Sequence, residues 1–478
     1  MRAVFRTGRT AGDDGWMTTA HLPAGLPESA GLSAPDLTDW ASSVPAADGP
    51  FGPVSQAVSA FLVRGQELAG RLPDARGTIN DILNGARDAY LRAHAAGLYD
   101  ALTDRCARPL RVEDLVYRAA AEVPGLAPTP AEMEAERGRM LADKEGIEFA
   151  QGLLVSHVLA LPRAGRHLVE SMLRPVPAAF EHLDRLRATG AAELGPVRIT
   201  RHGRAGVLEI RNPKHLNAED DVTLDLTECA VDMILLDPDI EVGVIRGGVV
   251  EHPRHPGSRV FGSGIKLTRL YHGRIDFLFY LVRDLGYVNK IYRGVTVTDP
   301  DVAGRHSPNQ PERDAVEKLW LAAVERYAVG GACQLLHVMD HVIAARGSRL
   351  FLPARKEGII PGASNLRLPR FVGDRAARQA IFSGREWTAG EPDAALLVDE
   401  VVQPGDMDTA LDARIEALTN SGLVNAAANR AALRAGQEPL DLFREYMATF
   451  SVEQARCHLS PALVRNLEVH WNARERSI

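Results

Sequence analysis

The chain has few cysteines, and they lie far apart. Only four occur among 478 residues, namely Cys106, Cys229, Cys333 and Cys457. No two of them form a CxxC pair, so the sequence lacks that common arrangement for zinc or for thiol–disulfide exchange. Four cysteines in so long a chain are also too few for a disulfide scaffold, and we therefore expect a protein of the reducing cytoplasm.

Long apolar runs and clusters of positive charge are also missing. The longest apolar run, residues 153–161, is interrupted by Ser156 and His157 and is far too short to span a bilayer. Acidic residues outnumber basic ones, which gives a formal net charge of -7, and the basic residues are dispersed. We therefore expect neither a nucleic acid nor a membrane as a partner.

The length predicts more than one domain. Residues 1–50 are rich in Gly, Pro, Ala and Asp and lack the apolar segment of a signal peptide, so we expect a flexible extension there. Residues 51–190 carry apolar side chains at spacings of three and four, which predicts an all-helical domain. Within it, Thr129-Pro-Ala-Glu132 has the pattern of a capping box with proline at the first helical position.

The pattern changes after a Gly- and Pro-containing break at residues 189–196. Short apolar runs fit for buried strands then alternate with stretches that we predict to be helical, which favours an α/β core over residues 196–405. The predicted strands are Gly206–Arg211, Val242–Arg246 and His341–Ala345, and the predicted helices include Thr223–Leu236 and Leu319–Val324. Residues 406–478 are rich in Ala, Leu and Arg and are predicted to be a helical C-terminal segment.

Two glycine-containing segments carry the clearest chemical signal, Phe261-Gly-Ser-Gly-Ile265 and Gly330-Gly-Ala-Cys-Gln334. Glycine lets the backbone approach a ligand closely and turn sharply. Two main-chain N–H groups brought together by the fold would form an oxyanion hole, in which each donor stabilises the developing charge by about 2.7–4 kcal/mol. Such a site suits the enolate of a thioester.

Five motifs in register extend this signal. They are Leu208–Ala218, Val260–Ile265, Ala328–Leu335, Asp340 and Gly358–Gly362. In order and approximate spacing they resemble the crotonase (enoyl-CoA hydratase/isomerase) superfamily. The resemblance implies a core of ββα units wound into a superhelix, an acyl-CoA substrate whose thioester oxygen is held by the N–H groups of Ile265 and Gly331, and assembly into homotrimers or hexamers.

Two glutamates that hydratases of this superfamily use to add water are missing. The third residue after the oxyanion glycine is Gln334, and the second position holds Ala354, beside Arg355. An amide and a methyl group cannot deprotonate or reprotonate a reacting water. The sequence therefore predicts an enolate-stabilising enzyme that does not carry out simple hydration.

A narrower resemblance covers nearly the whole chain apart from residues 1–50. It is to a family of dioxygenases of glycopeptide-antibiotic biosynthesis, and it rests on the segments Asn217–Asp221, Gly262–Leu267, Leu270–Arg274 and Val282–Tyr287, together with the helical first half. It implies that (3,5-dihydroxyphenyl)acetyl-CoA and O2 are converted to 3,5-dihydroxyphenylglyoxylate and CoA. It also implies that no metal, flavin or other cofactor takes part.

Several side chains are then candidates for substrate contacts. We expect Glu219 to accept a hydrogen bond from a ring hydroxyl and to be a candidate for proton removal, and Gln334 can both donate to and accept from a phenol. Arg283 is a candidate partner for a phenolate or for Glu219, and Gly264, in the first oxyanion turn, is a further candidate for substrate binding. The alternatives are a solvated carboxylate, a core amide and a surface salt bridge.

Other sites and functions stay open. His337 and His341, with Asp340 between them, have the residue types of a non-haem iron site, but Asp340 directly precedes His341 and so faces elsewhere. His252 and His255 lie in a Pro- and Gly-containing loop that we expect to be solvated, and Cys333 has no motif histidine beside it. The alternative functions are another acyl-CoA enzyme (isomerase, thioester hydrolase or decarboxylase) and a non-catalytic acyl-CoA-binding protein.

Overall fold

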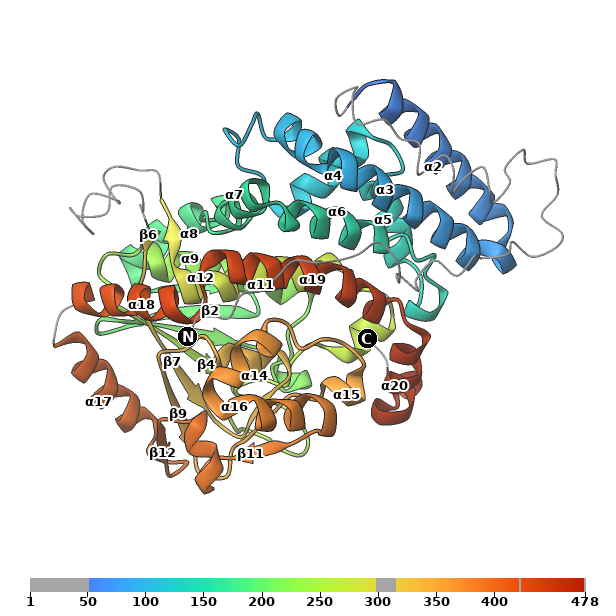
Figure 1. Cartoon of the computed structure of the whole chain (residues 1–478). Coiled ribbons are helices and arrows are strands. Elements are labelled where there is room, and N and C mark those ends of the chain that lie inside the picture. Colours follow the sequence, from blue (N-terminus) through green and yellow to red (C-terminus); the bar gives the residue numbers. More distant parts are fainter. Residues whose placement is uncertain (1–50, 298–314, 421–422, 477–478) are drawn as a thin grey trace, which may run out of the picture.

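The computed structural model describes residues 51–297, 315–420 and 423–476 (Figure 1). The flexible extension expected at residues 1–50 lies outside these described residues. The first described part is helical, as its apolar spacing predicts, and the capping box at Thr129 is present at the start of α5. The helices are α2 (Pro53–Arg71), α3 (Arg76–Leu102), α4 (Val112–Glu122), α5 (Pro130–Arg137), α6 (Phe149–Ala160), α7 (Pro162–Met172) and α8 (Pro177–Thr189).

A seven-stranded sheet follows, with the strand order β1-β2-β3-β4-β7-β9-β12. Strands β1 to β3 pair antiparallel, and the pairs from β3 to β12 are parallel. Strands β3, β4 and β9 confirm the three predicted strand segments. The bounds are β1 (Ala191–Leu194), β2 (Val197–His202), β3 (Ala205–Ile210), β4 (Val242–Gly247), β7 (Leu319–Val324), β9 (His341–Ala345) and β12 (Glu400–Val402).

Residues Leu319–Val324 correct the sequence prediction, because they form strand β7 and not a helix. The strand pairs with β4 on one side and with β9 on the other, so it lies inside the sheet. Its six apolar residues have no polar face, and periodicity alone does not separate a buried strand from a buried helix in so short a run. Pairing with a parallel strand on each side is what makes this segment a strand.

Shorter elements border this sheet and position the site. Strand β8 (Tyr327–Val329) pairs parallel with β10 (Arg349–Phe351), which pairs antiparallel with β11 (Glu386–Thr388). A two-stranded ribbon joins β5 (Val295–Thr296) to β6 (Ala315–Val316). The helices of this part are α9 (Asp221–Leu236), which confirms the predicted helix at Thr223–Leu236, α10 (Leu267–Tyr271), α11 (Leu278–Leu285), α12 (Tyr287–Arg293), α14 (Gly331–Leu336), α15 (Ala354–Glu357) and α16 (Ser364–Ser383).

The C-terminal part is helical, as predicted, and joins the two preceding parts. It consists of α17 (Met407–Thr419), α18 (Leu423–Gln437), α19 (Leu440–His458) and α20 (Pro461–Trp471). Helix α19 packs against α6 and α7, and in Figure 1 it runs along the boundary between the N-terminal helices and the α/β core. Helix α20 packs against α15, one of the elements that line the site. No described helix is long and apolar enough to cross a membrane.

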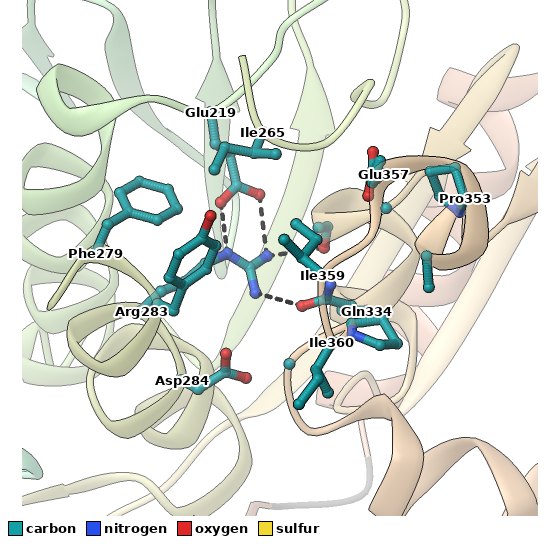
Figure 2. Close-up of a pocket in the computed structure, with 16 residues that line it drawn as sticks. Glu219, Ile265, Phe279, Arg283, Asp284, Gln334, Pro353, Glu357, Ile359 and Ile360 are labelled. Carbon is teal, nitrogen blue, oxygen red and sulfur yellow. Dashed lines mark hydrogen bonds and ion pairs between the residues drawn. The ribbon is translucent and has the colours of Figure 1, made fainter. Parts of the chain in front are cut away.

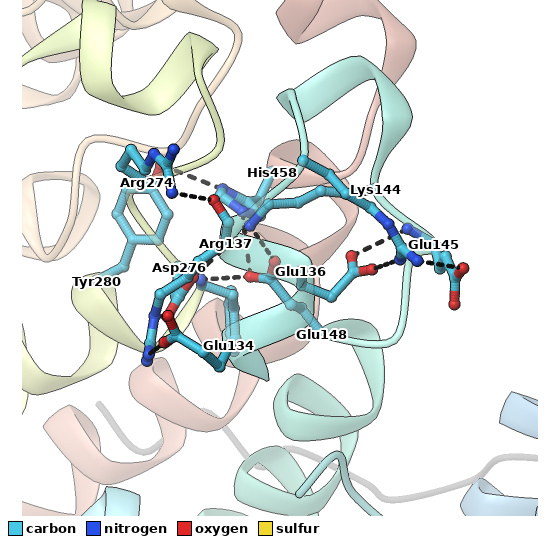
Figure 3. A network of polar contacts seen from close by, with 12 residues as sticks. Glu134, Glu136, Arg137, Lys144, Glu145, Glu148, Arg274, Asp276, Tyr280 and His458 are labelled. Atoms are coloured by element: carbon cyan, nitrogen blue, oxygen red, sulfur yellow. Dashed lines mark hydrogen bonds and ion pairs between the residues drawn. The ribbon is translucent and has the colours of Figure 1, made fainter. Parts of the chain in front are cut away.

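Buried charges hold this boundary together (Figure 3). Glu148, at the start of α6, is fully buried and pairs with Lys144 and with Nε2 of His458, at the end of α19, at 3.3 Å. It also accepts a hydrogen bond of 2.6 Å from the N–H of Phe277, just before α11. Although burial opposes ionisation, the charges of His458 and Lys144 lower the pKa of Glu148 to about 2. One carboxylate therefore ties three segments that are distant in sequence.

Candidate active site

The segment 261–265 lies between the residues that precede α9 and strand β8. On one side the N–H of Glu219 donates to the carbonyl of Gly264, and the N–H of Lys266 donates to the carbonyl of Glu219, both at 2.7 Å. On the other side Gly262 exchanges two hydrogen bonds of 3.1 Å with Tyr327 and Val329 of β8. The segment behaves as a short extra strand, and this pairing fixes Ile265 and Glu219 next to each other.

The second turn meets the first at two glycines with positive φ. Gly330 has φ 53° and precedes Gly331, the first residue of α14, while Gly264 has φ 81°. A Cβ added to Gly264 would lie 2.9 Å from the carbonyl oxygen of Val329 and 3.1 Å from the nitrogen of Gly331. The two turns are therefore in contact, and only glycine at position 264 permits this approach.

The two predicted oxyanion donors both line one cavity. In the described part of the chain, neither the N–H of Ile265 nor that of Gly331 donates to another backbone group. Unpaired backbone donors are uncommon in buried positions. Two of them on one cavity wall are what an oxyanion hole requires. Figure 2 shows the cavity, whose lining residues are Glu219, Ile265, Phe279, Tyr280, Arg283, Asp284, Gly330, Gly331, Gln334, Pro353, Ala354, Glu357, Ile359, Ile360, Pro361 and Gly362.

Arg283 of α11 is the centre of the polar side of this cavity. Its Nε donates to Oε2 of Glu219 at 2.6 Å and its Nη2 donates to Oε1 at 3.0 Å. Its Nη1 donates to Oε1 of Gln334 at 2.9 Å, and Nη2 also reaches the carbonyl of Gly331 at 2.8 Å. Figure 2 shows the guanidinium between Glu219 and Gln334. Burial opposes its charge, but Glu219 and its neighbours raise the pKa of Arg283 overall.

The structure thus brings together five of the six residues proposed from the sequence as substrate contacts or oxyanion donors, the exception being Gly264. Glu219, Gln334 and Arg283 meet directly, and the oxyanion residues Ile265 and Gly331 line the same cavity. A Cβ at Gly331 would lie 3.2 Å from Nη2 of Arg283, so the charged cluster reaches the oxyanion turn. Gly264 lies behind the wall, where it packs against the Gly331 turn and does not line the cavity.

Tyr287 is a functional candidate that sequence reasoning missed. Its hydroxyl donates to Oε2 of Glu219 at 2.8 Å, and the guanidinium of Arg283 lies over its ring, 5.4 Å from the centroid. Burial raises the pKa of Tyr287 well above its usual value, so it remains a neutral donor. Gly286 separates α11 from α12 and has a non-helical ψ of -115°, so helical spacing in the sequence does not indicate that Arg283 and Tyr287 meet.

Glu357 is the second residue that the sequence analysis missed. It lies on α15 three residues after Ala354, and both residues line the cavity. Only 6% of Glu357 is exposed, and burial raises the pKa of its carboxyl to about 7. A carboxyl group is therefore present near the position where hydratases of the resembled superfamily have their second glutamate, displaced by one helical turn.

The candidate metal ligands are not gathered at one point. Nδ1 of His337 contacts the hydroxyl of Ser364 at 3.1 Å, and burial, with the charge of Arg367, lowers the pKa of His337 to about 3. Asp340 accepts the N–H of Trp320 at 2.8 Å and the Nε of Arg430 at 2.9 Å. His341 lies on β9 and is 3.7 Å from Glu400. Each of these side chains has its own structural partner.

Three further residues considered from the sequence, His252, His255 and Cys333, do not line the cavity. The rings of His252 and His255 stack at 6.1 Å, and His255 contacts Tyr327 in a T-shaped arrangement. Cys333 is buried in α14, and burial raises the pKa of its thiol to about 12, which leaves it without thiolate character near neutral pH.

Comparison with known proteins agrees with the geometry. Residues 290–453 match the family model for enoyl-CoA hydratase/isomerase. The chain is also 46% identical to (3,5-dihydroxyphenyl)acetyl-CoA 1,2-dioxygenase from Amycolatopsis orientalis over 383 residues, which is 80% of this chain and 85% of that protein. The chain belongs to the enoyl-CoA hydratase/isomerase family. Membership confirms the predicted crotonase-like α/β core, and the similarity to the dioxygenase extends beyond that core into the helical parts.

More distant relatives align over a smaller share of the chain. A probable enoyl-CoA hydratase of Mycobacterium bovis is 27% identical over 234 residues, 49% of this chain and 78% of that protein. Among solved structures, an enoyl-CoA hydratase from Mycobacterium avium subsp. paratuberculosis is 18% identical with a TM-score of 0.46, covering 60% of this chain and 99% of that one.

Proposed function

We propose that this chain is a dioxygenase that converts (3,5-dihydroxyphenyl)acetyl-CoA and O2 to 3,5-dihydroxyphenylglyoxylate and CoA. The observation that carries the proposal is one cavity in which the oxyanion donors Ile265 and Gly331 adjoin the buried cluster of Glu219, Arg283 and Gln334. The 46% identity to the Amycolatopsis orientalis dioxygenase supports the same activity.

The cavity has complementary parts for such a substrate. The thioester oxygen is assigned to the N–H groups of Ile265 and Gly331, which stabilise an enolate where its charge develops. The ring hydroxyls are assigned to the polar cluster, where the NH2 group of Gln334 can donate and the oxygens of Glu219 can accept. An apolar wall around the reacting carbon is formed by Phe279, Ile359 and Ile360, and it limits the access of water.

The reaction balances without an added reductant. Loss of one α-proton gives the enolate, whose electrons reduce O2 and form a C–O bond, giving a peroxide on the α-carbon. The peroxide oxygen attacks the thioester carbonyl and expels CoA as the thiolate. Cleavage of the O–O bond with loss of the second α-proton gives the ketone and the carboxylate. Each product group takes one oxygen atom from O2.

We propose further that no metal or flavin takes part, because the substrate carbanion supplies the electrons. The contribution of the protein is then orientation of the thioester, electrostatic stabilisation of the enolate and exclusion of water. We also propose a homotrimer or hexamer, on the basis of the family resemblance, and a location in the cytoplasm, on the basis of the scarcity of cysteine.

The test is oxygen consumption by the full-length protein after treatment with a chelator. (3,5-Dihydroxyphenyl)acetyl-CoA is added, and O2 uptake and free CoA are followed together. We expect equal amounts of O2 consumed and CoA released, with no stimulation by added iron. CoA release without oxygen uptake would instead indicate a thioester hydrolase, and uptake restored only by iron would overturn the cofactor-independent reaction.

A further inference from the structure

Three carboxyl groups line the active-site cavity, and two of them are engaged. Both oxygens of Glu219 receive hydrogen bonds, from Arg283 and from Tyr287. Asp284 accepts the N–H of Ala363 at 3.2 Å. Among the carboxyl groups that line the described cavity, Glu357 alone has neither a side-chain hydrogen bond nor an ion pair, although it is 6% exposed. Burying an unpaired carboxyl is costly, so its position calls for an explanation.

Glu357 also lies close to the oxyanion turn. A Cβ built on Gly330 would be 3.9 Å from Oε1 of Glu357, and Gly330 directly precedes the donor Gly331. The α-carbon of a bound thioester is one bond from the carbonyl that this donor would hold. Figure 2 shows Glu357 and Phe279 on opposite sides of the cavity, with Ile265 above. The carboxyl is therefore beside the place where the α-proton must be removed.

We propose that Glu357 is the general base that removes the first α-proton of the arylacetyl-CoA. This inference rests on the proposed function of the same site. In the step, the C–H bond breaks and an O–H bond forms on Glu357, while the electron pair moves to the thioester oxygen held by Ile265 and Gly331. No oxidant takes part, so the step can be measured separately from the reaction with O2.

The electrostatics of the cavity agree with this role. Burial raises the pKa of Glu357 to about 7, and no charged side chain contributes to that shift. Four other titratable groups line the cavity, namely Glu219 and, from α11, Tyr280, Arg283 and Asp284. Helices α16 and α20 pack against α15 from outside. A base whose pKa lies near the working pH combines a useful ionised fraction with a strong drive for proton transfer. Glu219, by contrast, already accepts three hydrogen bonds, which leaves one of its roughly four acceptor positions for a ring hydroxyl.

The experiment is exchange of the α-hydrogens for deuterium in the absence of oxygen. The full-length protein and (3,5-dihydroxyphenyl)acetyl-CoA are mixed in D2O under argon, and label in the recovered thioester is followed by mass spectrometry. We expect the wild-type protein to exchange, at a rate that rises with pH through the region near 7. Glu357→Gln should slow this exchange by about 100-fold or more, since general base catalysis contributes 10²–10⁴-fold.

Controls separate a base from a structural residue. Glu357→Asp keeps a carboxylate on a shorter arm, so it should retain partial exchange and the rise with pH that Glu357→Gln loses. The affinity of both variants for the substrate should stay near that of the wild type. Full exchange by Glu357→Gln would overturn the role of Glu357 and leave the proposed function standing, whereas absence of exchange in the wild-type protein would overturn both.

Discussion

Arg283 holds both carboxylate oxygens of Glu219, through Nε at 2.6 Å and Nη2 at 3.0 Å. The two side chains come from segments 64 residues apart in sequence, and they are only 4% and 7% exposed. A bidentate pair of this kind fixes orientation as well as distance, because the planar guanidinium matches the carboxylate. The pair, together with Gln334 and Tyr287, gives the cavity a rigid polar wall against which an aromatic ring can be oriented.

Arg283→Lys should therefore lower kcat/KM by about 10- to 100-fold, because a single ammonium cannot replace the bidentate contact and a charged hydrogen bond contributes about 1.5–3 kcal/mol. Steady-state oxygen uptake at several substrate concentrations gives the kcat/KM of each variant. The matched control is Arg269→Lys, since Arg269 also makes two bonds of 2.6 Å to a carboxylate, that of Asp221, but does not line the cavity. Equal losses in the two variants would contradict a special role for Arg283.

Gln334→Glu should weaken turnover of the dihydroxylated substrate by about 10-fold or more, since it removes an NH2 donor and adds a carboxylate near Glu219. The same change should have little effect with phenylacetyl-CoA, whose ring has no hydroxyl to bind. The ratio of kcat/KM values for the two thioesters is the measurement. A variant that loses activity equally on both would show that Gln334 does not contact the ring.

Gly264→Ala should reduce kcat by about 100-fold, because a Cβ 3.1 Å from the nitrogen of Gly331 displaces one oxyanion donor, and loss of one donor costs 10²–10³ in rate. Gly257→Ala is the control. Its φ of 70° imposes similar backbone strain, but a Cβ there meets nothing within 4 Å. Retained activity in Gly264→Ala, with unchanged folding, would show that the approach of the two turns is unimportant.

The sequence indicated the two glycine turns that meet at the cavity, because a glycine with positive φ at a close backbone approach leaves a local pattern. Gly264 and Gly330 both have such conformations. Arg283 was a weaker prediction, since its partner Glu219 is brought to it only by the fold. Strand β7 was assigned wrongly, because its apolar run Leu319–Val324 carries no periodicity and its neighbours in the sheet lie far away in sequence.

Glu357 and Tyr287 were missed for a related reason. The sequence comparison directed attention to position 354, where the expected glutamate is absent, and not to the next turn of the same helix. Whether position 357 faces the cavity depends on how α15 is set between α16 and α20, which is a property of tertiary packing. The bond from Tyr287 to Glu219 likewise joins residues 68 apart.

Glu148→Gln should destabilise the protein by about 3–5 kcal/mol, because it removes the nearer carboxylate partner of the buried Lys144 and leaves only Asp276, at 3.7 Å. Urea unfolding at neutral pH measures the change in the free energy of unfolding. Glu134→Gln is the control within the same region (Figure 3), since Glu134 is 76% exposed and its pair with Arg137 should contribute about 0–1 kcal/mol. Equal effects of the two changes would contradict the structural role of Glu148.

The low pKa of Glu148 also predicts the direction of its acid dependence. Its folded-state value of about 2 lies below the ordinary 4.5, so its contribution to stability is complete above pH 4.5 and is lost as the pH falls towards 2. The difference in stability between wild type and Glu148→Gln should therefore shrink over that range. A difference that stays constant down to pH 2 would mean that Glu148 is not ionised in the folded protein.

Glu357→Gln should have the opposite effect on stability. The folded state holds the proton of Glu357 more tightly, with a pKa of about 7 against 4.5, so the wild-type protein loses stability as the pH rises from 4.5 through 7. The amide does not ionise, and the variant should be more stable than wild type by about 3 kcal/mol above pH 8. Thermal unfolding at pH 5 and pH 8.5 tests this, and an equal difference at both values would contradict the burial of an ionisable carboxyl.

The enolate held by Ile265 and Gly331 should react with O2 so that both oxygen atoms enter the product. This outcome is tested most directly with ¹⁸O2 and the chelator-treated, full-length protein, followed by rapid quenching and mass spectrometry of the acid product, because a ketone oxygen exchanges with water. We expect two labelled atoms in 3,5-dihydroxyphenylglyoxylate, one of them in the carboxylate. A carboxylate labelled from H2¹⁸O and not from ¹⁸O2 would contradict this expectation.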